Sequence, residues 1–337
     1  MDSVTMEPVK VLNQASGENH AVYHGDCIEV LAGIPSESIH YSIFSPPFAS
    51  LYVYSNSERD MGNSADYEEF FQHFGLVIDE LFRVIMPGRL VSVHCMNLPT
   101  TMQHHGEIGI QDFRGDIIAN FKRRKFIYHS EVTIWKDPVT AMQRTKALGL
   151  LHKQVVKDSC MSRMGIPDFV ETFRKPGANP EPVAGEFDRF IGDHSGFKSE
   201  KKLSIDVWQR YASPVWMDIN PTRVLQYTQA REENDDRHIC PLQLDVIERC
   251  MELWSNEGDT VLSPFGGVGS EGVVAVETGR RSISIELKES YFKHNVANHA
   301  AAEKQRKETK RTLFDGEKEE GEPSPEAEVE VEVDSLL

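Results

Sequence analysis

The stretch Ile39-His40-Tyr41-Ser42-Ile43-Phe44-Ser45-Pro46-Pro47-Phe48 decides the fold. Its apolar first part predicts a buried strand, and the two prolines predict a rigid turn at the carboxyl end of that strand. A proline has no backbone N–H group, so the turn presents carbonyl oxygens without donors beside them. Ligands of open α/β sheets bind at this carboxyl edge. The stretch therefore predicts an acceptor site there.

The turn joins a hydroxyl, a carbonyl and an aromatic ring in Ser45-Pro46-Pro47-Phe48. An exocyclic amine on a flat ring suits this set, because its N–H groups can point at Ser45 and at the Pro46 carbonyl while the ring stacks on Phe48. Cytosine and adenine are such rings. On its own, a four-residue match is more typical of a strand-terminating turn with a core phenylalanine, so the rest of the chain must decide.

A second motif, Ser263-Pro264-Phe265-Gly266-Gly267-Val268-Gly269, follows a predicted strand at 260–263. A predicted helix at 270–277 and a strand at 282–286 come next. A glycine-rich turn of this kind lets a ligand approach the backbone, and the acid Glu286 at the end of the next strand can accept both hydroxyls of a ribose. The loop is not GxGxxG, so it indicates a nucleoside at least as well as a dinucleotide.

Strand and helix patterns alternate around both motifs, as in a parallel sheet with crossover helices. Further strands are predicted at 21–24, 89–95 and 126–135, and further helices at 27–34, at 112–125, from Asp66 to the Pro87-Gly88 break and from Pro241 to Gly258. Residues 97–110 look irregular. From 137 to about 212, Gly, Pro and charged residues interrupt every run, which predicts an inserted module and not a continuation of the sheet.

Composition excludes several classes of protein. The five cysteines show no CxxC spacing, which favours reduced thiols over a disulfide scaffold or a structural zinc site, and no metal is predicted. No apolar run is long enough to span a bilayer and no signal peptide is recognised, so we expect a cytoplasmic protein. The net charge of −17 is concentrated at the end: residues 315–337 hold ten acids and one lysine.

Basic residues gather in the body of the chain despite this charge. Phosphate contacts are predicted for Lys122, Arg123, Arg124, Lys125, Arg144 and Lys146. A solvated helix end explains the run at 122–125 equally well.

Together the two motifs resemble those of the beta-class amino-methyltransferases of DNA, which methylate N4 of cytosine or N6 of adenine with S-adenosylmethionine. That family places a Ser/Asp-Pro-Pro-Phe/Tyr catalytic motif before an Asp-Pro-Phe-x-Gly-x-Gly cofactor motif, with target recognition between them. This chain has the same order, over residues 20–137 and 216–300. The resemblance implies an α/β fold: a Rossmann-like methyltransferase sheet, circularly permuted, with an inserted target-recognition module.

The resemblance also implies roles for single residues. Ser45, Pro46, Pro47 and Phe48 would form the catalytic loop. S-adenosylmethionine would be held by Asp26, Ser263, Phe265, Gly266, Gly267, Gly269 and Glu286. The chain departs from the family at Ser263, where Asp is usual, at Ser270-Glu271, where two threonines are commoner, and at residues 237–241, which are shorter than the family's His-x-x-x-x-Pro element.

The predicted domains are a flexible arm (1–19), a catalytic half (20–136), a target-recognition module (137–215), a cofactor-binding half (216–305) and a disordered acidic tail (306–337). Within the family, Ser in the first motif position goes mainly with cytosine and Asp with adenine. The resemblance thus implies N4-methylation of a cytosine flipped out of duplex DNA. N6-adenine methylation, another acceptor such as RNA or a protein amide, and a DNA-binding pseudoenzyme stay open, as do a homodimer and a partner restriction nuclease.

Overall fold

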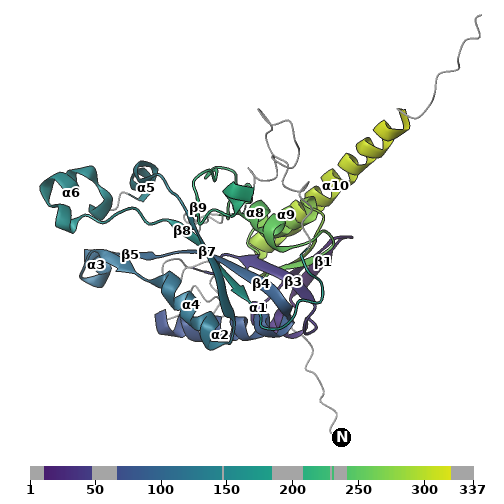
Figure 1. Cartoon of the computed structure of the whole chain (residues 1–337), viewed down its shortest axis with the longest axis horizontal. Helices are drawn as coiled ribbons and strands as arrows, with labels where there is room; N and C mark the ends of the chain where they lie inside the picture. The colour runs from purple at the N-terminus through teal and green to yellow at the C-terminus, as the bar shows by residue number, and fades with distance from the viewer. Residues whose placement is uncertain are drawn as a thin grey trace, which may run out of the picture.

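The predicted strand at the start of the deciding stretch is a central strand of the main sheet. The computed structural model describes residues 11–47, 67–145, 148–183, 208–227, 230 and 241–319. In this part of the chain the main sheet has nine strands (Figure 1). In spatial order they are β1 (Asn13–Ser16), β2 (His20–His24), β11 (Arg281–Glu286), β10 (Thr260–Ser263), β3 (Ile39–Phe44), β4 (Ile85–Met96), β8 (Asp168–Arg174), β7 (Ile127–Ile134) and β9 (Val215–Trp216).

Five neighbouring strands, from β2 to β4 in this order, run parallel. Strand β8 is antiparallel to both β4 and β7. The late strands β10 and β11 lie between the early strands β2 and β3. This mixed, mostly parallel sheet confirms the predicted α/β class and its permuted order.

Helices cover both faces of the sheet (Figure 1). On one face α1 (Cys27–Ala32), α2 (Tyr67–Val84) and α4 (Phe113–Arg123) form a core with Phe44, Val93 and Phe173. On the other face α8 (Leu244–Trp254) and α9 (Ser270–Glu277) pack on Tyr41 and Ile43, and α10 (Glu289–Glu319) contacts α9. The apolar stripe predicted for 66–86 is buried along α2, at residues including Phe70, Phe74, Val77, Ile78 and Leu81.

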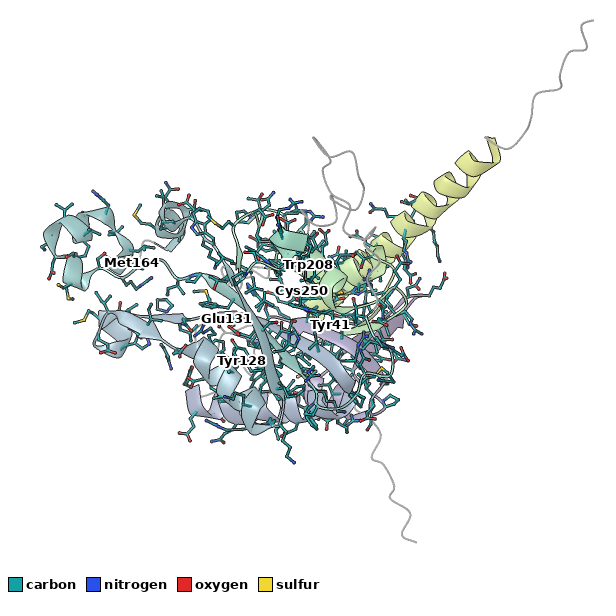
Figure 2. The ribbon with its side chains drawn as sticks, viewed as in Figure 1. Tyr41, Tyr128, Glu131, Met164, Trp208 and Cys250 are labelled. Carbon is teal, nitrogen blue, oxygen red and sulfur yellow. The ribbon has the colours of Figure 1, made fainter. Side chains whose placement is uncertain are left out.

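Short elements extend the chain beyond the covered sheet. They are β5 (Leu98–Thr100), α3 (Met102–His105), β6 (Gly109–Gln111), α5 (Pro138–Thr145), η3 (Leu148–Leu150), α6 (His152–Lys157) and η4 (Ser159–Met161). Figure 1 shows α3 with β5, and α5 with α6, projecting from the same end of the molecule. Met164 lies in this outlying segment (Figure 2) and is 81% exposed. In the described part of the chain, no helix is both long and apolar enough to cross a bilayer.

Five expectations about local structure are wrong. Residues 13–16 of the predicted arm pair with β2, and residues 97–110 contain a small two-stranded sheet. The predicted module is not wholly outside the sheet, because its residues 168–174 form β8 between β4 and β7. Residues 306–319 of the predicted tail continue helix α10, where pairs such as Lys304–Glu308 occupy i, i+4 positions. Strand β4 also starts at Ile85, so the helix before it ends ahead of the Pro87-Gly88 break.

Candidate active site

Both sequence motifs lie at one edge of the sheet, where the parallel strands end. Register places His24 beside Glu286, and Ser263 beside Ser284. Ser45 follows β3, the next strand after β10 in the sheet. The backbone N–H of Gly25 donates to the Glu286 carbonyl, 3.0 Å away, which ties the end of β2 to the end of β11. The glycine loop, Glu286 and the Ser-Pro-Pro turn therefore share one edge, as predicted.

Glu286 fixes the shape of the glycine loop. Its Oε2 accepts from the backbone N–H of Gly267 and its Oε1 from that of Lys288, both at 2.7 Å. Gly266 is held against β11 by a hydrogen bond to the Ile285 carbonyl, and a Cβ atom on Gly266 would lie 2.0 Å from Ser284 Oγ. Only glycine fits there. The sequence predicted a ribose acceptor at Glu286 and did not predict this anchoring of the loop.

The loop leaves room and polar atoms for a nucleoside-type ligand. Gly267 has φ +52°, and a Cβ atom built on it would meet nothing within 4 Å. Ser263 Oγ is buried and has no hydrogen-bond partner among the described residues. Gly269 closes the loop with φ +96°, a conformation that favours glycine. A cradle of this kind fits S-adenosylmethionine, because the ligand brings donors and acceptors of its own.

Two predicted cofactor residues have structural partners of their own. Asp26 caps α1, since its Oδ1 accepts from the backbone N–H groups of Ile28 (2.9 Å) and Glu29 (3.2 Å). Phe265 is half-buried, and its ring lies 5.6 Å from the ring of Phe44. Asp26 follows β2 and Phe265 follows β10, and their contact with the cofactor stays a prediction.

Glu271, the second residue of α9, lies buried directly behind this loop. Burial raises the pKa of its carboxyl to about 8, and the charge of Glu286 adds to the effect. Since the ordinary value is 4.5, the carboxyl ionises more easily in the unfolded chain, so the free energy of unfolding falls as pH rises from about 4.5 to about 8.

Glu271→Gln is therefore expected to be more stable than the wild type near pH 8.5, by on the order of 1–3 kcal/mol, the cost of a buried group without compensation. Near pH 4 the two proteins should be about equally stable, because Glu271 is then mostly neutral in the folded and in the unfolded chain. Urea unfolding at the two pH values measures this. A difference that does not change with pH would contradict the buried, perturbed carboxyl.

A chain of polar side chains leads away from Ser45. Ser45 Oγ lies 2.9 Å from His94 Nδ1, near the end of β4. His94 Nε2 faces Asp168 Oδ2 at 3.4 Å, which is long for a hydrogen bond and close for an electrostatic contact. Asp168 Oδ1 also accepts a hydrogen bond from Lys136 Nζ. Sequence reasoning missed His94 and Asp168, although each is a polar residue at the site end of a strand.

Asp168 supplies the negative charge in this row of polar side chains. It is 3% exposed, and burial alone would raise its pKa. The hydrogen bond and charge of His94, together with the Lys136 ammonium, outweigh burial and lower the pKa of Asp168 below its usual value. Asp168 is therefore a carboxylate at neutral pH.

The predicted phosphate-binding residues at 122–125 do not lie at this edge. Lys122 and Arg123 end α4, and Lys125 precedes β7, so they lie at the opposite edge, because β7 runs from there to the site. Arg124 pairs with Asp79, its Nε lying 3.1 Å from Asp79 Oδ1. The side chain of Arg144 and the whole of Lys146 lie outside the described residues, as do Phe48 and residues 237–240. A role in DNA binding stays a prediction for all six basic residues.

Among the described residues, one group has the ligand types of a metal site: His40, Glu181 and Asp259. His40 Nδ1 accepts from the Thr260 N–H (3.1 Å), so its proton is on Nε2, which donates to Glu181 (3.0 Å). Asp259 pairs with the guanidinium of Arg89. These bonds use the lone pairs that would ligate a cation. The group forms a hydrogen-bonded network at the edge opposite to Ser45.

Comparison with known proteins gives a consistent result. Residues 39–298 match the model of a family described as DNA methylase. The type II methyltransferase M.BamHI of Bacillus amyloliquefaciens is 24% identical over 270 residues, which are 79% of this chain and 54% of that protein. The chain thus spans about half the length of that relative. The DNA adenine methyltransferase YhdJ of Escherichia coli K12 is 26% identical over 318 residues, 90% of this chain and 91% of that protein.

Solved structures share the fold. A protein of Thermus thermophilus named as a putative DNA modification methylase, solved with S-adenosyl-L-methionine, aligns with a TM-score of 0.59 and 22% identity over 84% of this chain and 93% of that chain. The cytosine-N4-specific PvuII DNA methyltransferase aligns with a TM-score of 0.56 and 18% identity over 91% of this chain and 97% of that chain.

Proposed function

This chain belongs to the DNA methylase family, and we propose that it transfers a methyl group from S-adenosylmethionine to the exocyclic N4 of a cytosine in duplex DNA. The observation that carries the proposal is the position of Ser45, at the same sheet edge as the glycine loop. In this proposal Ser45 binds the exocyclic amine of the base, and the glycine loop after the neighbouring strand β10 binds the methyl donor S-adenosylmethionine.

When bound, S-adenosylmethionine supplies an electrophilic methyl group. We assign its nucleoside part to the cradle of Ser263, Gly267 and Glu286. The carboxylate of Glu286 accepts two backbone N–H groups, and carboxylate oxygens can accept more than one hydrogen bond each, as a ribose hydroxyl would require. The Glu286 carboxylate would then bind both the glycine loop and the ribose of the ligand.

The acceptor amine is a poor nucleophile, because its lone pair is delocalised into the ring. Hydrogen bonds from its N–H groups to Ser45 Oγ and to the Pro46 carbonyl would favour a tetrahedral nitrogen and stabilise the positive charge that develops there. The base must leave the duplex to reach this edge, at a cost of a few kcal/mol. Stacking on Phe48 would offset part of that cost, and this role stays a prediction.

Cytosine is favoured over adenine by Ser45, since Asp usually occupies that position in the family's adenine enzymes. A specific observation supports the second candidate: YhdJ, named as an adenine methyltransferase, aligns over 90% of this chain. N6-adenine methylation is therefore the alternative function.

A labelled product distinguishes the two. Purified protein is incubated with genomic DNA from a host without DNA methylation and with methyl-labelled S-adenosylmethionine, and the digested nucleosides are separated by mass. Label in N4-methylcytosine is the expected result. Label in N6-methyladenine would keep the reaction and overturn the choice of base.

We propose that sequence recognition lies between β7 and β9, in the residues on either side of β8, of which the structure describes 137–145, 148–167, 175–183 and 208–214. Its exposed apolar side chains include Val139, Val156 and Met164. Duplex DNA is the proposed partner, and a restriction nuclease would act on the same site, as the type II names of relatives suggest. Deletion of 152–161 should abolish sequence-specific DNA binding and spare binding of S-adenosylmethionine, as calorimetry with each ligand would show.

A further inference from the structure

The proton that leaves the methylated amine needs an acceptor, and the residues behind Ser45 offer one. This inference rests on the proposed function. Loss of one N–H proton completes the reaction, because the nitrogen becomes positively charged when it gains the methyl group. Water has poor access behind Ser45, since His94 is 8% exposed and Asp168 is 3% exposed. A proton that leaves the amine through Ser45 therefore reaches a protein group before it reaches water.

The geometry points to His94 as that acceptor: we propose that His94 takes the proton through Ser45 while Asp168 stabilises the imidazolium that forms. His94 acts through Ser45 and is thus a positioning and proton-accepting residue. The three groups come from three neighbouring strands, β3, β4 and β8, which fixes their mutual positions.

The tautomer of His94 follows from its two neighbours. A carboxylate only accepts hydrogen bonds, so the Nε2 atom that faces Asp168 at 3.4 Å must carry the ring proton. The opposite tautomer would direct a lone pair at the carboxylate. Nδ1 is then the acceptor toward Ser45 Oγ, at 2.9 Å. The Ser45 hydroxyl donates to His94 and leaves its own lone pairs for the amine.

The proton transfer balances on these atoms. One N–H bond of the methylated amine breaks, and its electron pair stays on the nitrogen, which becomes neutral. The proton passes to Ser45 Oγ as the Ser45 proton passes to His94 Nδ1. Ser45 ends as a neutral hydroxyl, and His94 ends as an imidazolium beside Asp168. His94 later returns the proton to solvent.

Lys136 weakens the electrostatic effect of Asp168 on His94. Its ammonium pairs with Oδ1 of Asp168 while His94 faces Oδ2, so the carboxylate divides its charge between them. In the described part of the chain, His94 contacts Ser45 and the charged group of Asp168. The charge of Lys136 reaches His94 through Asp168. Removing Lys136 would direct the whole charge of Asp168 at His94 and favour its protonated form.

Single-turnover methylation rates across pH test this. The wild-type rate should rise with pH along an acid limb, because only neutral His94 can accept. In His94→Asn the side-chain oxygen can still accept from Ser45 but cannot take a proton, so the rate should fall about 10²–10⁴-fold and the acid limb should vanish. In Lys136→Met the acid limb should move to higher pH. His129→Asn, at an exposed site on β7, is the matched control and should behave like the wild type.

Binding of S-adenosylmethionine shows which variants are folded. A folded His94→Asn enzyme that keeps the wild-type acid limb would overturn the proposal. So would a Lys136→Met enzyme with an unmoved limb, and this variant keeps the test valid if His94→Asn fails to fold, because Lys136 is 36% exposed. A wild-type protein that methylates no DNA at any pH would instead refute the proposed function.

Discussion

Ser45→Ala is expected to lower the rate of methyl transfer about 10²–10³-fold, the usual effect of removing one preorganised group that stabilises a transition state. The variant loses the acceptor for the amine and the link to His94, 2.9 Å away. It loses no core packing, because Ser45 lies beyond the end of β3 and is only half-buried. The affinity for S-adenosylmethionine should therefore stay within a few-fold of the wild type.

Single-turnover kinetics with saturating DNA and cofactor measures this effect on the chemical step. Ser16→Ala, an exposed serine on β1, is a suitable control and should keep the wild-type rate. If Ser45→Ala turned over like the wild type, the turn would be a strand terminator only, which is the simpler interpretation of its sequence.

Glu286→Gln should raise the dissociation constant for S-adenosylmethionine about 10–100-fold, because a charged hydrogen bond contributes about 1.5–3 kcal/mol and about 1.4 kcal/mol is a factor of ten. The amide offers one acceptor oxygen where the carboxylate offers two. Either Gly267 or Lys288 then loses its 2.7 Å partner, and the glycine loop loses its anchor. The ribose loses a charged acceptor as well.

Isothermal titration calorimetry with S-adenosylmethionine would measure the change. Glu289→Gln, three residues further along at an exposed site where Glu289 pairs with Lys293, is the matched control and should bind like the wild type. An unchanged affinity in Glu286→Gln would mean that neither the loop anchor nor the ribose contact contributes to binding.

The sequence predicted the parts of the site that are local. The turn after β3 and the glycine loop after β10 each follow an apolar strand, and both motifs keep their chemistry within a few residues. The parallel order then brings them to one edge. The hydrogen bond between Glu286 and the Gly267 N–H was harder to predict from the sequence. An acid at that position is expected to bind a ribose, and this expectation does not indicate that the acid also holds the loop.

The sequence could not predict the partners of Ser45, because they depend on strand β8. That strand is buried along nearly all its length but carries Asp168, Glu171 and Thr172, so it shows no apolar run. Its polar residues are satisfied across strands, as when Ser92 Oγ lies 2.9 Å from Thr172 Oγ1. Only the register of β4 with β8 brings His94 close to Asp168. The same loss of periodicity concealed strand β8 within residues 137–215, which were expected to form a module outside the sheet.

The most direct test of the central claim is the DNA of a host that has no methylation of its own and expresses this chain. Such a genome presents every recognition sequence, so the site need not be known beforehand. The account predicts N4-methylcytosine at one short sequence in cells with the wild-type chain, and none in cells with Ser45→Ala. Unmethylated DNA in cells that hold folded wild-type protein able to bind S-adenosylmethionine would contradict it.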